Sequence, residues 1–305
     1  MNRKTQVILI AAVCLLALAG AGWLAFRGQL GTVVDMQTWR EVTDMTGRTV
    51  RLPARPEHVL SLCTSATDTI ATMHEEARLA AIDEYSRVVD GTDKAVVIGK
   101  GSAISKEQVL ALKIDLAFVW WYQDDAAAML EGLGIPVGRI RSGRAAQVPS
   151  TIRLVGDCLG CRPKADALAL SVEEFLRQAS SRPAQAARPV VYLELYSPFK
   201  TVGQDSYMND LLELAGGSNI ARDVAGTVIL SAERLIQADP DVILFVDGFA
   251  TTQAITERPG ISGLNAAKMG RIHAIDRRWL VAGPSLPVAV ERLREAITGS
   301  SHERQ

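Results

Sequence analysis

The pair of cysteines in the run Cys158-Leu-Gly-Cys161 is the first candidate for chemistry in this sequence. Three states suit this spacing: a local disulfide, a redox-active dithiol, or two reduced thiols that pack in the core. A thioredoxin-like motif follows a strand and opens a helix, whereas this pair lies between two expected helices. In an exported chain, a disulfide between Cys158 and Cys161 is therefore the leading prediction. We expect Cys63 to be a small buried residue at a strand end.

Patterns typical of enzymes are missing from the sequence. The four histidines are dispersed, and there is neither a Gly-x-Ser-x-Gly run nor a Gly-Lys-Ser/Thr loop that would hold a phosphate. Gly99-Lys-Gly101 lacks the third glycine of a dinucleotide-binding loop. We therefore predict a protein that is not an enzyme and has no cofactor of its own.

Aromatic residues make up only 5% of the chain, and many of them follow expected strands. In a parallel sheet, ligands bind beyond the carboxyl ends of the strands, so we expect these side chains to face a cleft. Aromatic walls suit a large flat or hydrophobic ligand, and Arg278 could pair with a carboxylate on it. The predicted ligand-binding residues are Thr64, Ser65, Tyr85, Trp120, Trp121, Tyr122, Tyr196, Tyr207, Asp247, Arg278 and Trp279. The sequence does not identify a metal site.

Two stretches of the chain nearly repeat each other, residues 105–119 and 231–245. Serine, glutamate and aspartate recur 126 positions apart, and the glutamates are Glu107 and Glu233. Each copy predicts a serine-capped helix with a glutamate in its first turn, a tight turn at the aspartate, and a buried strand. One such glutamate would simply complement the helix dipole. The recurrence in register indicates two exposed acidic points, one in each half of the protein.

A buried strand in each copy requires helices on both faces of its sheet, which predicts an α/β fold with two lobes. The expected strands are residues 59–62, 79–82, 96–99, 116–119, 134–138, 190–195, 242–245 and 271–275, after a hairpin at 42–53. The expected helices are residues 67–73, 126–133, 149–157, 163–182, 209–216 and 287–298, besides one in each repeat copy.

An apolar run from Val7 to Phe26 follows Arg3 and Lys4. Its length and basic flank fit a signal peptide or an uncleaved membrane anchor, and its continuation beyond the small residues at 17–21 favours an anchor. In either case the basic end stays in the cytoplasm, so we expect the rest of the chain outside the cytoplasmic membrane. The 305 residues carry a net charge of −1, which argues against a nucleic-acid partner.

Several sequence blocks, taken in order, point to one family. They are residues 42–53 with Pro56, residues 59–68, both repeat copies, residues 211–220 and Gly283-Pro284. Together they resemble the substrate-binding proteins of ABC importers for iron–siderophore, haem and cobalamin, the class III periplasmic binding proteins. The resemblance covers residues 41–298. Asp68 stands where this family usually has glutamate, and Cys63 stands where proline is common.

The resemblance implies two Rossmann-like lobes with parallel sheets, joined by one long helix at about residues 163–182. The expected division is 1–40 for the signal peptide or anchor with a spacer, 41–160 for the N-terminal lobe, 161–187 for the connecting helix and linker, and 188–305 for the C-terminal lobe. It further implies a monomer that captures a metal chelate between its lobes. Glu107 and Glu233 would dock onto arginines of two ABC permease subunits.

The sequence leaves the ligand open. Haem would need an axial residue such as Tyr85, Tyr122, Tyr196 or Tyr207, cobalamin would suit the tryptophan pair, and a ferric siderophore would suit arginines with aromatics. A molybdate-type oxyanion is a further alternative. Two other functions also remain: a membrane-anchored ligand sensor or scaffold without transport, and a redox protein that uses Cys158 and Cys161.

Overall fold

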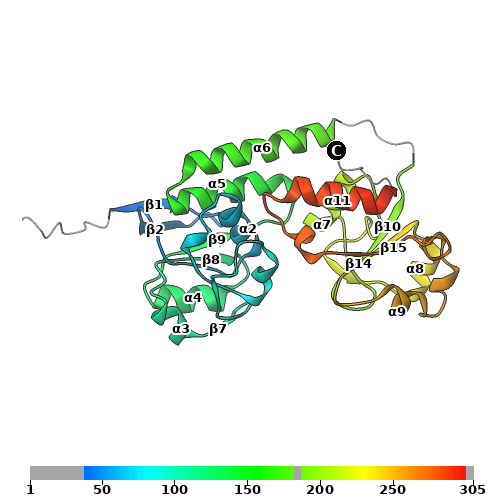
Figure 1. Cartoon of the computed structure of the whole chain (residues 1–305), viewed down its shortest axis with the longest axis horizontal. Coiled ribbons are helices and arrows are strands. Elements are labelled where there is room, and N and C mark those ends of the chain that lie inside the picture. Colours follow the sequence, from blue (N-terminus) through cyan, green and yellow to red (C-terminus); the bar gives the residue numbers. More distant parts are fainter. Residues whose placement is uncertain (1–37, 182–186, 300–305) are drawn as a thin grey trace, which may run out of the picture. The chain divides into compact units, whose positions relative to one another are not determined.

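The computed structural model describes residues 38–181 and 187–299 (Figure 1). The chain divides into two compact units, residues 1–39 and 40–305, and the account below concerns the second. The apolar run at 7–26 lies outside the described residues, so its role as signal peptide or anchor stays a prediction. Within the described part, no helix combines the length and the apolar character needed to cross a membrane.

Five parallel strands form the first sheet, which we call the N-terminal sheet, in the order β5-β4-β3-β8-β9. These strands are β3 Val59–Ser61, β4 Leu79–Ile82, β5 Val96–Val97, β8 Leu116–Trp120 and β9 Val137–Ile140. Along β8, Phe118 belongs to one hydrophobic cluster and its neighbours Ala117 and Val119 belong to another. Because successive side chains point to opposite faces, both faces of this sheet are covered.

Helices and short strands surround the N-terminal sheet. They are β1 Trp39–Thr43, β2 Thr49–Pro53, α2 Thr64–Thr72, η1 Glu76–Arg78, η2 Glu84–Val88, β6 Gly99–Lys100, β7 Ala103–Ile104, α3 Lys106–Ala111, α4 Asp124–Gly132, η3 Ala145–Gln147 and α5 Val148–Leu159. The strand predicted for 96–99 ends at Val97. The reason is the tight β6–β7 hairpin, in which a Cβ at Gly99 would collide with the carbonyl of Ala103.

Four parallel strands form the second sheet, the C-terminal sheet, in the order β12-β10-β14-β15. These strands are β10 Val190–Glu194, β12 Ser218–Asn219, β14 Val242–Val246 and β15 Ile272–Ile275. Its flanking elements are β11 Lys200–Val202, α7 Tyr207–Leu214, β13 Thr227–Ile229, α8 Ala232–Ala238, α9 Thr252–Thr256, η4 Ile261–Gly263, α10 Asn265–Lys268, η5 Arg277–Leu280 and α11 Leu286–Thr298. All five residues of β14 are buried, as a strand covered on both faces requires.

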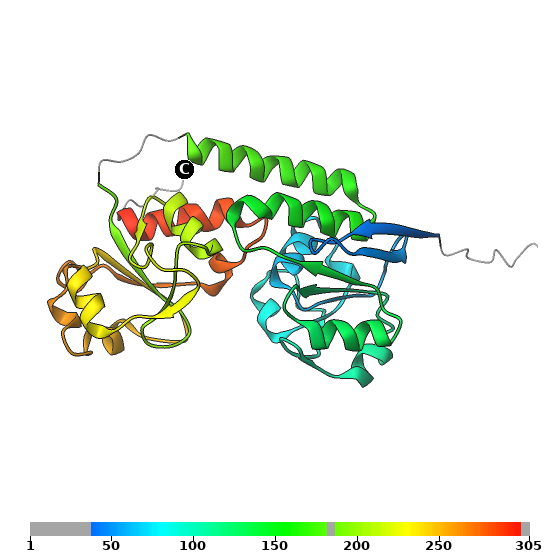
Figure 2. The ribbon, with the colours of Figure 1, turned by 180° about the vertical axis from the view of Figure 1, so that it is seen from behind.

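A helix of 19 residues, α6 Arg162–Ser180, stands between the two sheets in chain order. It runs along α5 in both views (Figure 1 and Figure 2), and the approach is close because a Cβ at Gly156 would collide with that of Ala165. One hydrophobic cluster combines side chains of α5, α6 and α11 with strand residues from both sheets. The helix predicted for 163–182 is therefore present, and the predicted α/β fold with parallel sheets is confirmed.

In the described ranges, four pairs of residues make polar contacts between elements around the N-terminal sheet and elements around the C-terminal sheet. They are Asp68 with Ser285, Arg144 with Asp210, the backbone N–H of Ala145 with Asp210, and Asp90 with Arg278.

Candidate ligand-binding site

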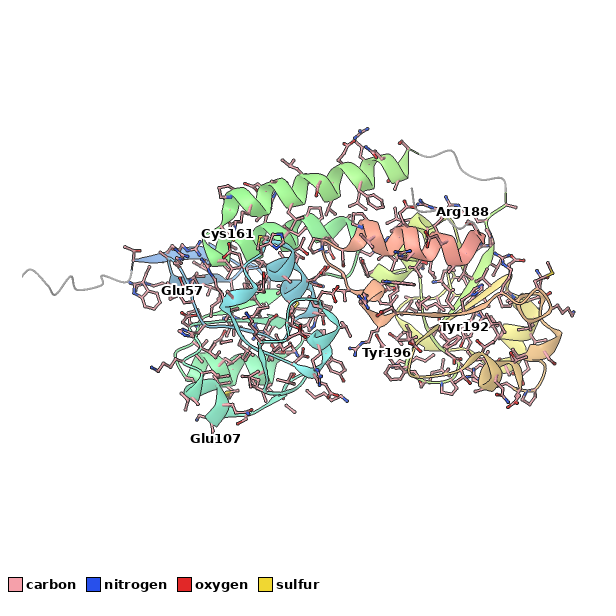
Figure 3. All side chains as sticks on the ribbon, viewed as in Figure 1. Glu57, Glu107, Cys161, Arg188, Tyr192 and Tyr196 are labelled. Atoms are coloured by element: carbon pink, nitrogen blue, oxygen red, sulfur yellow. The ribbon has the colours of Figure 1, made fainter. Side chains whose placement is uncertain are left out.

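The carboxyl ends of the parallel strands carry the polar and aromatic side chains, as expected for this kind of sheet. Trp120 ends β8, and η2, which contains Tyr85, follows β4. Around the C-terminal sheet, Tyr196 follows β10, and η5 begins with Arg277 after β15. Figure 3 shows Tyr196 beyond the end of β10, whereas Tyr192 lies within the sheet.

Arg277 contacts one aromatic ring beside the N-terminal sheet, Tyr85, and one beside the C-terminal sheet, Tyr196. Its guanidinium carbon lies 4.9 Å from the centre of the Tyr85 ring and 5.5 Å from the centre of the Tyr196 ring. In the described ranges, Arg277 forms no ion pair with an acidic side chain. The positive charge of Arg277 lowers the pKa of nearby Asp83, but burial has the larger effect, so the pKa of Asp83 is raised. The guanidinium is thus held mainly by two aromatic faces, a cation–π arrangement that leaves its hydrogen-bond donors unused by carboxylates.

Three consecutive aromatic residues form a second group at the end of β8. The rings of Trp120 and Tyr122 stack with centres 6.3 Å apart, and Trp121 meets Tyr122 edge-on at 4.9 Å. The backbone N–H of Trp120 donates to the side chain of buried Gln123, which fixes this turn. Tyr122 is 61% exposed, so one of its ring faces is available to a ligand. Partial burial and the nearby groups Cys63, Asp83 and Tyr85 raise the pKa of Tyr122.

Phe249 also belongs to this aromatic group, although it is not among the ligand-binding residues predicted from the sequence. Its ring meets that of Tyr196 edge-on at 4.9 Å, and it is 52% exposed. The available signal was its place three residues after β14. The predicted site residue Asp247 is exposed, and its carboxylate accepts a hydrogen bond from the backbone N–H of Gly248 at 2.8 Å. Asp247 therefore shapes the turn that carries Phe249.

Arg278, the arginine predicted to meet a ligand carboxylate, is already paired. Its Nε donates to Asp276 at 2.7 Å, and its guanidinium also lies 3.4 Å from Asp90. Its neighbour Trp279 is half-buried and packs against the main hydrophobic cluster. In the 3₁₀ turn η5, consecutive residues point in different directions, so the neighbouring Arg277 takes the position among the aromatic rings.

Three other residues predicted to bind the ligand, Thr64, Ser65 and Tyr207, are partly or fully buried. Tyr207 is buried and its hydroxyl donates to the carbonyl of Val281 at 2.8 Å, so it does not offer an axial oxygen. Ser65 is fully buried within α2, and Thr64 is the half-buried first residue of that helix, which begins earlier than predicted. Cys63 is buried as expected, and burial raises the pKa of its thiol to about 12.

A separate cavity of about 750 Å³ is lined by none of these rings. Its walls come from α2, the end of η2, η5 and α11, and include Asp68, Asp90, Arg278, Trp279 and Arg292. Arg278 and Arg292 are paired with acidic residues there. Because the exposed aromatic rings that follow the strands gather around Arg277 and do not line this cavity, we place the candidate site around Arg277.

The predicted disulfide is not formed, because Cys158 and Cys161 are both free thiols. Cys158 is buried in the last turn of α5, where burial raises its pKa to about 12. Gly160 then reverses the chain in a left-handed conformation, and Cys161 Sγ lies 3.9 Å from Met73 Sδ. The pair thus has the third state weighed from the sequence, two packing thiols.

Glu107 and Glu233 have matching surroundings. Each stands in the first turn of its helix behind a serine N-cap, Ser105 for α3 and Ser231 for α8. Hydrogen bonds from its own backbone N–H and from the serine hold the pKa of each carboxyl below its ordinary value. Both side chains are exposed, and Figure 3 shows Glu107 at the outer edge of the fold. Neither carboxylate forms an ion pair with a basic side chain in the described part of the chain.

No group of three or more His, Cys, Asp or Glu side chains within residues 38–181 and 187–299 could hold a metal ion. Aromatic faces and a guanidinium suit a ligand that has a flat body and an acid group.

Comparison with known proteins gives a consistent result. Residues 59–278 match the model of the periplasmic binding protein family. The chain is 27% identical over 271 residues to an uncharacterized ABC transporter substrate-binding lipoprotein, YvrC, of Bacillus subtilis, covering 84% of each chain. It is 28% identical over 216 residues to a cobalamin-binding protein of Halobacterium salinarum, covering 66% of this chain and 57% of that protein.

A solved structure shares the fold. The periplasmic heme-binding protein RhuT from Roseiflexus sp. RS-1, in its apo form, aligns with a TM-score of 0.73 at 23% identity, covering 80% of this chain and 98% of RhuT. The family model spans most of the chain and includes both parallel sheets; β1, β2 and the last helix α11 lie outside the matched range. The chain belongs to the periplasmic binding protein family.

Proposed function

We propose that this chain is the extracytoplasmic substrate-binding protein of an ABC importer and that it carries a metal chelate: a ferric siderophore, cobalamin or haem. Family membership and the names of its relatives support the transport role. The cobalamin-binding and heme-binding proteins among its relatives and structural neighbours support a large chelate as the ligand class. Export would follow from the apolar run at 7–26, with the basic end in the cytoplasm.

The observation that carries the proposal is the position of Arg277 between Tyr85 and Tyr196. A guanidinium can bind the carboxylate or phosphate of a ligand through two parallel hydrogen bonds while it remains stacked on aromatic rings. Tyr122, which follows β8, and Phe249, which follows β14, add exposed aromatic faces. A ligand with a flat conjugated body and at least one acid group matches both features.

Among the tyrosines considered as axial ligands of haem, Tyr85, Tyr122 and Tyr196 have exposed side chains, whereas Tyr207 is buried. The haem proposal therefore rests on the first three. The same residues and the tryptophans beside Tyr122 would stack on the corrin ring of cobalamin or on an aromatic siderophore.

We further propose that residues 41–160 and 188–305 act as two lobes, with 161–187 as the connection, and that the ligand binds between them. The hydrogen bonds from Ser285 to Asp68 and from Arg144 to Asp210 would restrain the lobes during binding. A restrained pair of lobes keeps most of the site preformed, which lowers the entropic cost of binding. Glu107 and Glu233 would dock onto two permease subunits, and the protein would act as a monomer.

A ligand screen with the full chain in mild detergent tests this function. The thermal midpoint of unfolding is measured with haemin, cyanocobalamin and ferric citrate, and visible spectra are recorded for each mixture. A ligand at 100 times its Kd adds about 2.7 kcal/mol of stability, which raises the midpoint by on the order of 5 °C for a chain of this size. If no chelate raises the midpoint or changes its spectrum, the proposed ligand class is excluded.

A further inference from the structure

The helices α3 and α8 share an exposed apolar side chain as well as a glutamate. Leu110 in α3 is 55% exposed, and Ile236 in α8 is 41% exposed. These two positions are 126 residues apart, the same offset that separates Glu107 from Glu233. The preceding residues, Val109 and Leu235, are buried in both copies, so each helix uses one aliphatic residue for its core and presents the next one to the surface.

Each exposed aliphatic residue lies three positions after its glutamate. On a helix, side chains at this spacing lie on the same face, about 5–6 Å apart at Cβ. We call these surfaces the acid–apolar faces: Glu107 with Leu110 on α3, and Glu233 with Ile236 on α8. Other positions of the two helices outside the core differ between the copies, since Gln108 corresponds to Arg234 and Ala111 to Gln237.

The second acid–apolar face is held in place by its surroundings. A Cβ at Gly260 would lie 2.4 Å from Ile236 Cδ1, so the backbone at Gly260 supports this side chain from one side. Gly260 has a φ of +82°, a conformation that favours glycine. Ile236 is therefore presented to the surface in a supported position.

Single exposed aliphatic residues are common and need no explanation. Here the same combination recurs at matched positions of a duplicated unit, which indicates a partner that is itself present twice. We propose that each acid–apolar face seats on one of two permease subunits, where a cationic side chain meets the glutamate and an adjacent apolar pocket takes Leu110 or Ile236. This inference rests on the proposed transport function and adds the apolar half of the docking surface.

The two halves of each face should contribute differently. An exposed ion pair contributes little affinity and is screened by salt. Burial of an aliphatic side chain in a pocket contributes more and does not depend on charge. Leu110 and Ile236 should therefore set the salt-resistant part of docking, and the glutamates should set its salt-dependent part.

The test measures binding of the full, ligand-free chain to a candidate ABC permease from the same genome, reconstituted in nanodiscs, at about 50 and 500 mM salt. The variants are Leu110→Gln and Ile236→Gln, with Glu107→Gln and Glu233→Gln for comparison. Leu170→Gln is the matched control, because Leu170 is 59% exposed on α6, outside both faces. We expect each apolar variant to weaken binding about tenfold at both salt concentrations. The glutamate variants should weaken it chiefly at low salt, and the control should change neither value.

The two levels of the proposal fail in different ways. If the glutamate variants weaken docking while Leu110→Gln and Ile236→Gln bind like the Leu170→Gln control, the apolar contact is overturned and the transport function stands. If the unmodified chain does not bind the permease at either salt concentration, the proposed function fails and the inference fails with it. Circular dichroism and the thermal midpoint establish that each variant is folded.

Discussion

The carboxylate of Asp68 accepts two hydrogen bonds from Ser285, one from the backbone N–H at 3.1 Å and one from the hydroxyl at 2.8 Å. This contact joins α2, beside the N-terminal sheet, to the residue before α11, beside the C-terminal sheet. It is also tight, because a Cβ at Gly283 would collide with the Asp68 carboxylate. Burial raises the pKa of Asp68, and the hydrogen bonds from Ser285 only partly oppose this effect.

The raised pKa predicts a pH-dependent contribution to stability. A carboxyl group whose pKa is higher in the folded state stabilises the fold fully below its unfolded pKa, 3.8, and this contribution is lost as pH rises through the folded value. Asp68→Asn keeps an acceptor for Ser285 without a charge. The thermal midpoint of the native chain relative to this variant should therefore fall as pH rises above about 4. Asp93→Asn is the control, because Asp93 is exposed and does not contribute to the raised pKa of Asp68. A pH-independent difference between Asp68→Asn and the native chain would contradict the buried charge.

Arg277 and Arg278 form a natural pair of test residues, since they are adjacent but have different partners. Arg277→Ala should weaken binding of an acid-bearing chelate by about 10- to 100-fold, because a charge-assisted pair is worth about 1.5–3 kcal/mol. Arg278→Ala should leave the Kd nearly unchanged. The measurement is a titration followed by tryptophan fluorescence. Equal losses for the two variants would show that the Tyr85–Arg277–Tyr196 arrangement does not select the ligand.

We expect Tyr122 to strengthen ligand binding by aromatic stacking. Tyr122→Ala should raise the Kd about tenfold, because an aromatic pair contributes about 0.5–1.5 kcal/mol beyond the area it buries. Tyr122→Phe keeps the ring and removes only the hydroxyl, so for cobalamin or a siderophore it should bind like the native chain. For haem, a loss in Tyr122→Phe together with a changed Soret band would instead identify this phenol as the axial ligand. A Kd unaffected by Tyr122→Ala would place the ligand away from the aromatic group.

Much of the fold could be predicted because its signals are local. The buried strands of the two repeat copies, and the helical spacing that produced α6, are visible as apolar patterns over five or more residues. The paired strands β6–β7 and β11–β13 were missed because they contain two or three residues each. Such short pairs of strands depend on a turn glycine and on contacts with distant parts of the chain. Two or three residues are too few to show the alternating apolar pattern by which a strand is recognised.

The sequence predicted which side chains follow the strands but not how these side chains pair. The pattern indicated that aromatic residues follow the strands, and Tyr85, Trp120 and Tyr196 do so. It could not show which of two adjacent arginines faces the rings, because that depends on the direction of a single 3₁₀ turn. It also could not show that Tyr207 is buried, because its hydroxyl finds a partner 74 residues away in the chain.

We expect the three free thiols to react with a thiol reagent in a clear order. Burial raises the pKa of Cys63 and of Cys158 to about 12, and both side chains are inaccessible. Cys161 is half-buried, and burial raises its pKa as well, so it differs from the other two thiols mainly in accessibility. In a Cys14→Ser background, a thiol reagent at pH 8 should modify Cys161 first, while the other two react only after unfolding. Mass spectrometry of the labelled chain gives the sites. Recovery of unlabelled Cys158 and Cys161 linked to each other would restore the disulfide.

The loop that carries Tyr196 depends on a buried ion pair. Glu194 is fully buried and accepts hydrogen bonds from Arg258 at 2.5 and 2.8 Å, from the Tyr192 hydroxyl at 2.8 Å and from the backbone N–H of Phe199 at 2.9 Å. Burial opposes the charge of Glu194, but these donors prevail and hold its pKa below the ordinary value. Because Phe199 closes the turn that begins after Glu194, the pair fixes Tyr196 beside Arg277.

Removal of the cation should therefore affect both stability and binding. Arg258→Ala leaves a buried carboxylate without its partner, which should cost about 3–5 kcal/mol in the free energy of unfolding measured with urea at pH 7. The double variant Arg258→Ala with Glu194→Gln removes the unpaired charge and should recover part of that loss. The contribution of Glu194 should be present above pH 4.5 and decline as pH falls through its folded pKa. If Arg258→Ala unfolds at the same urea concentration as the native chain, the ion pair does not hold this loop, and Tyr196 must be positioned by its contact with Phe249 alone.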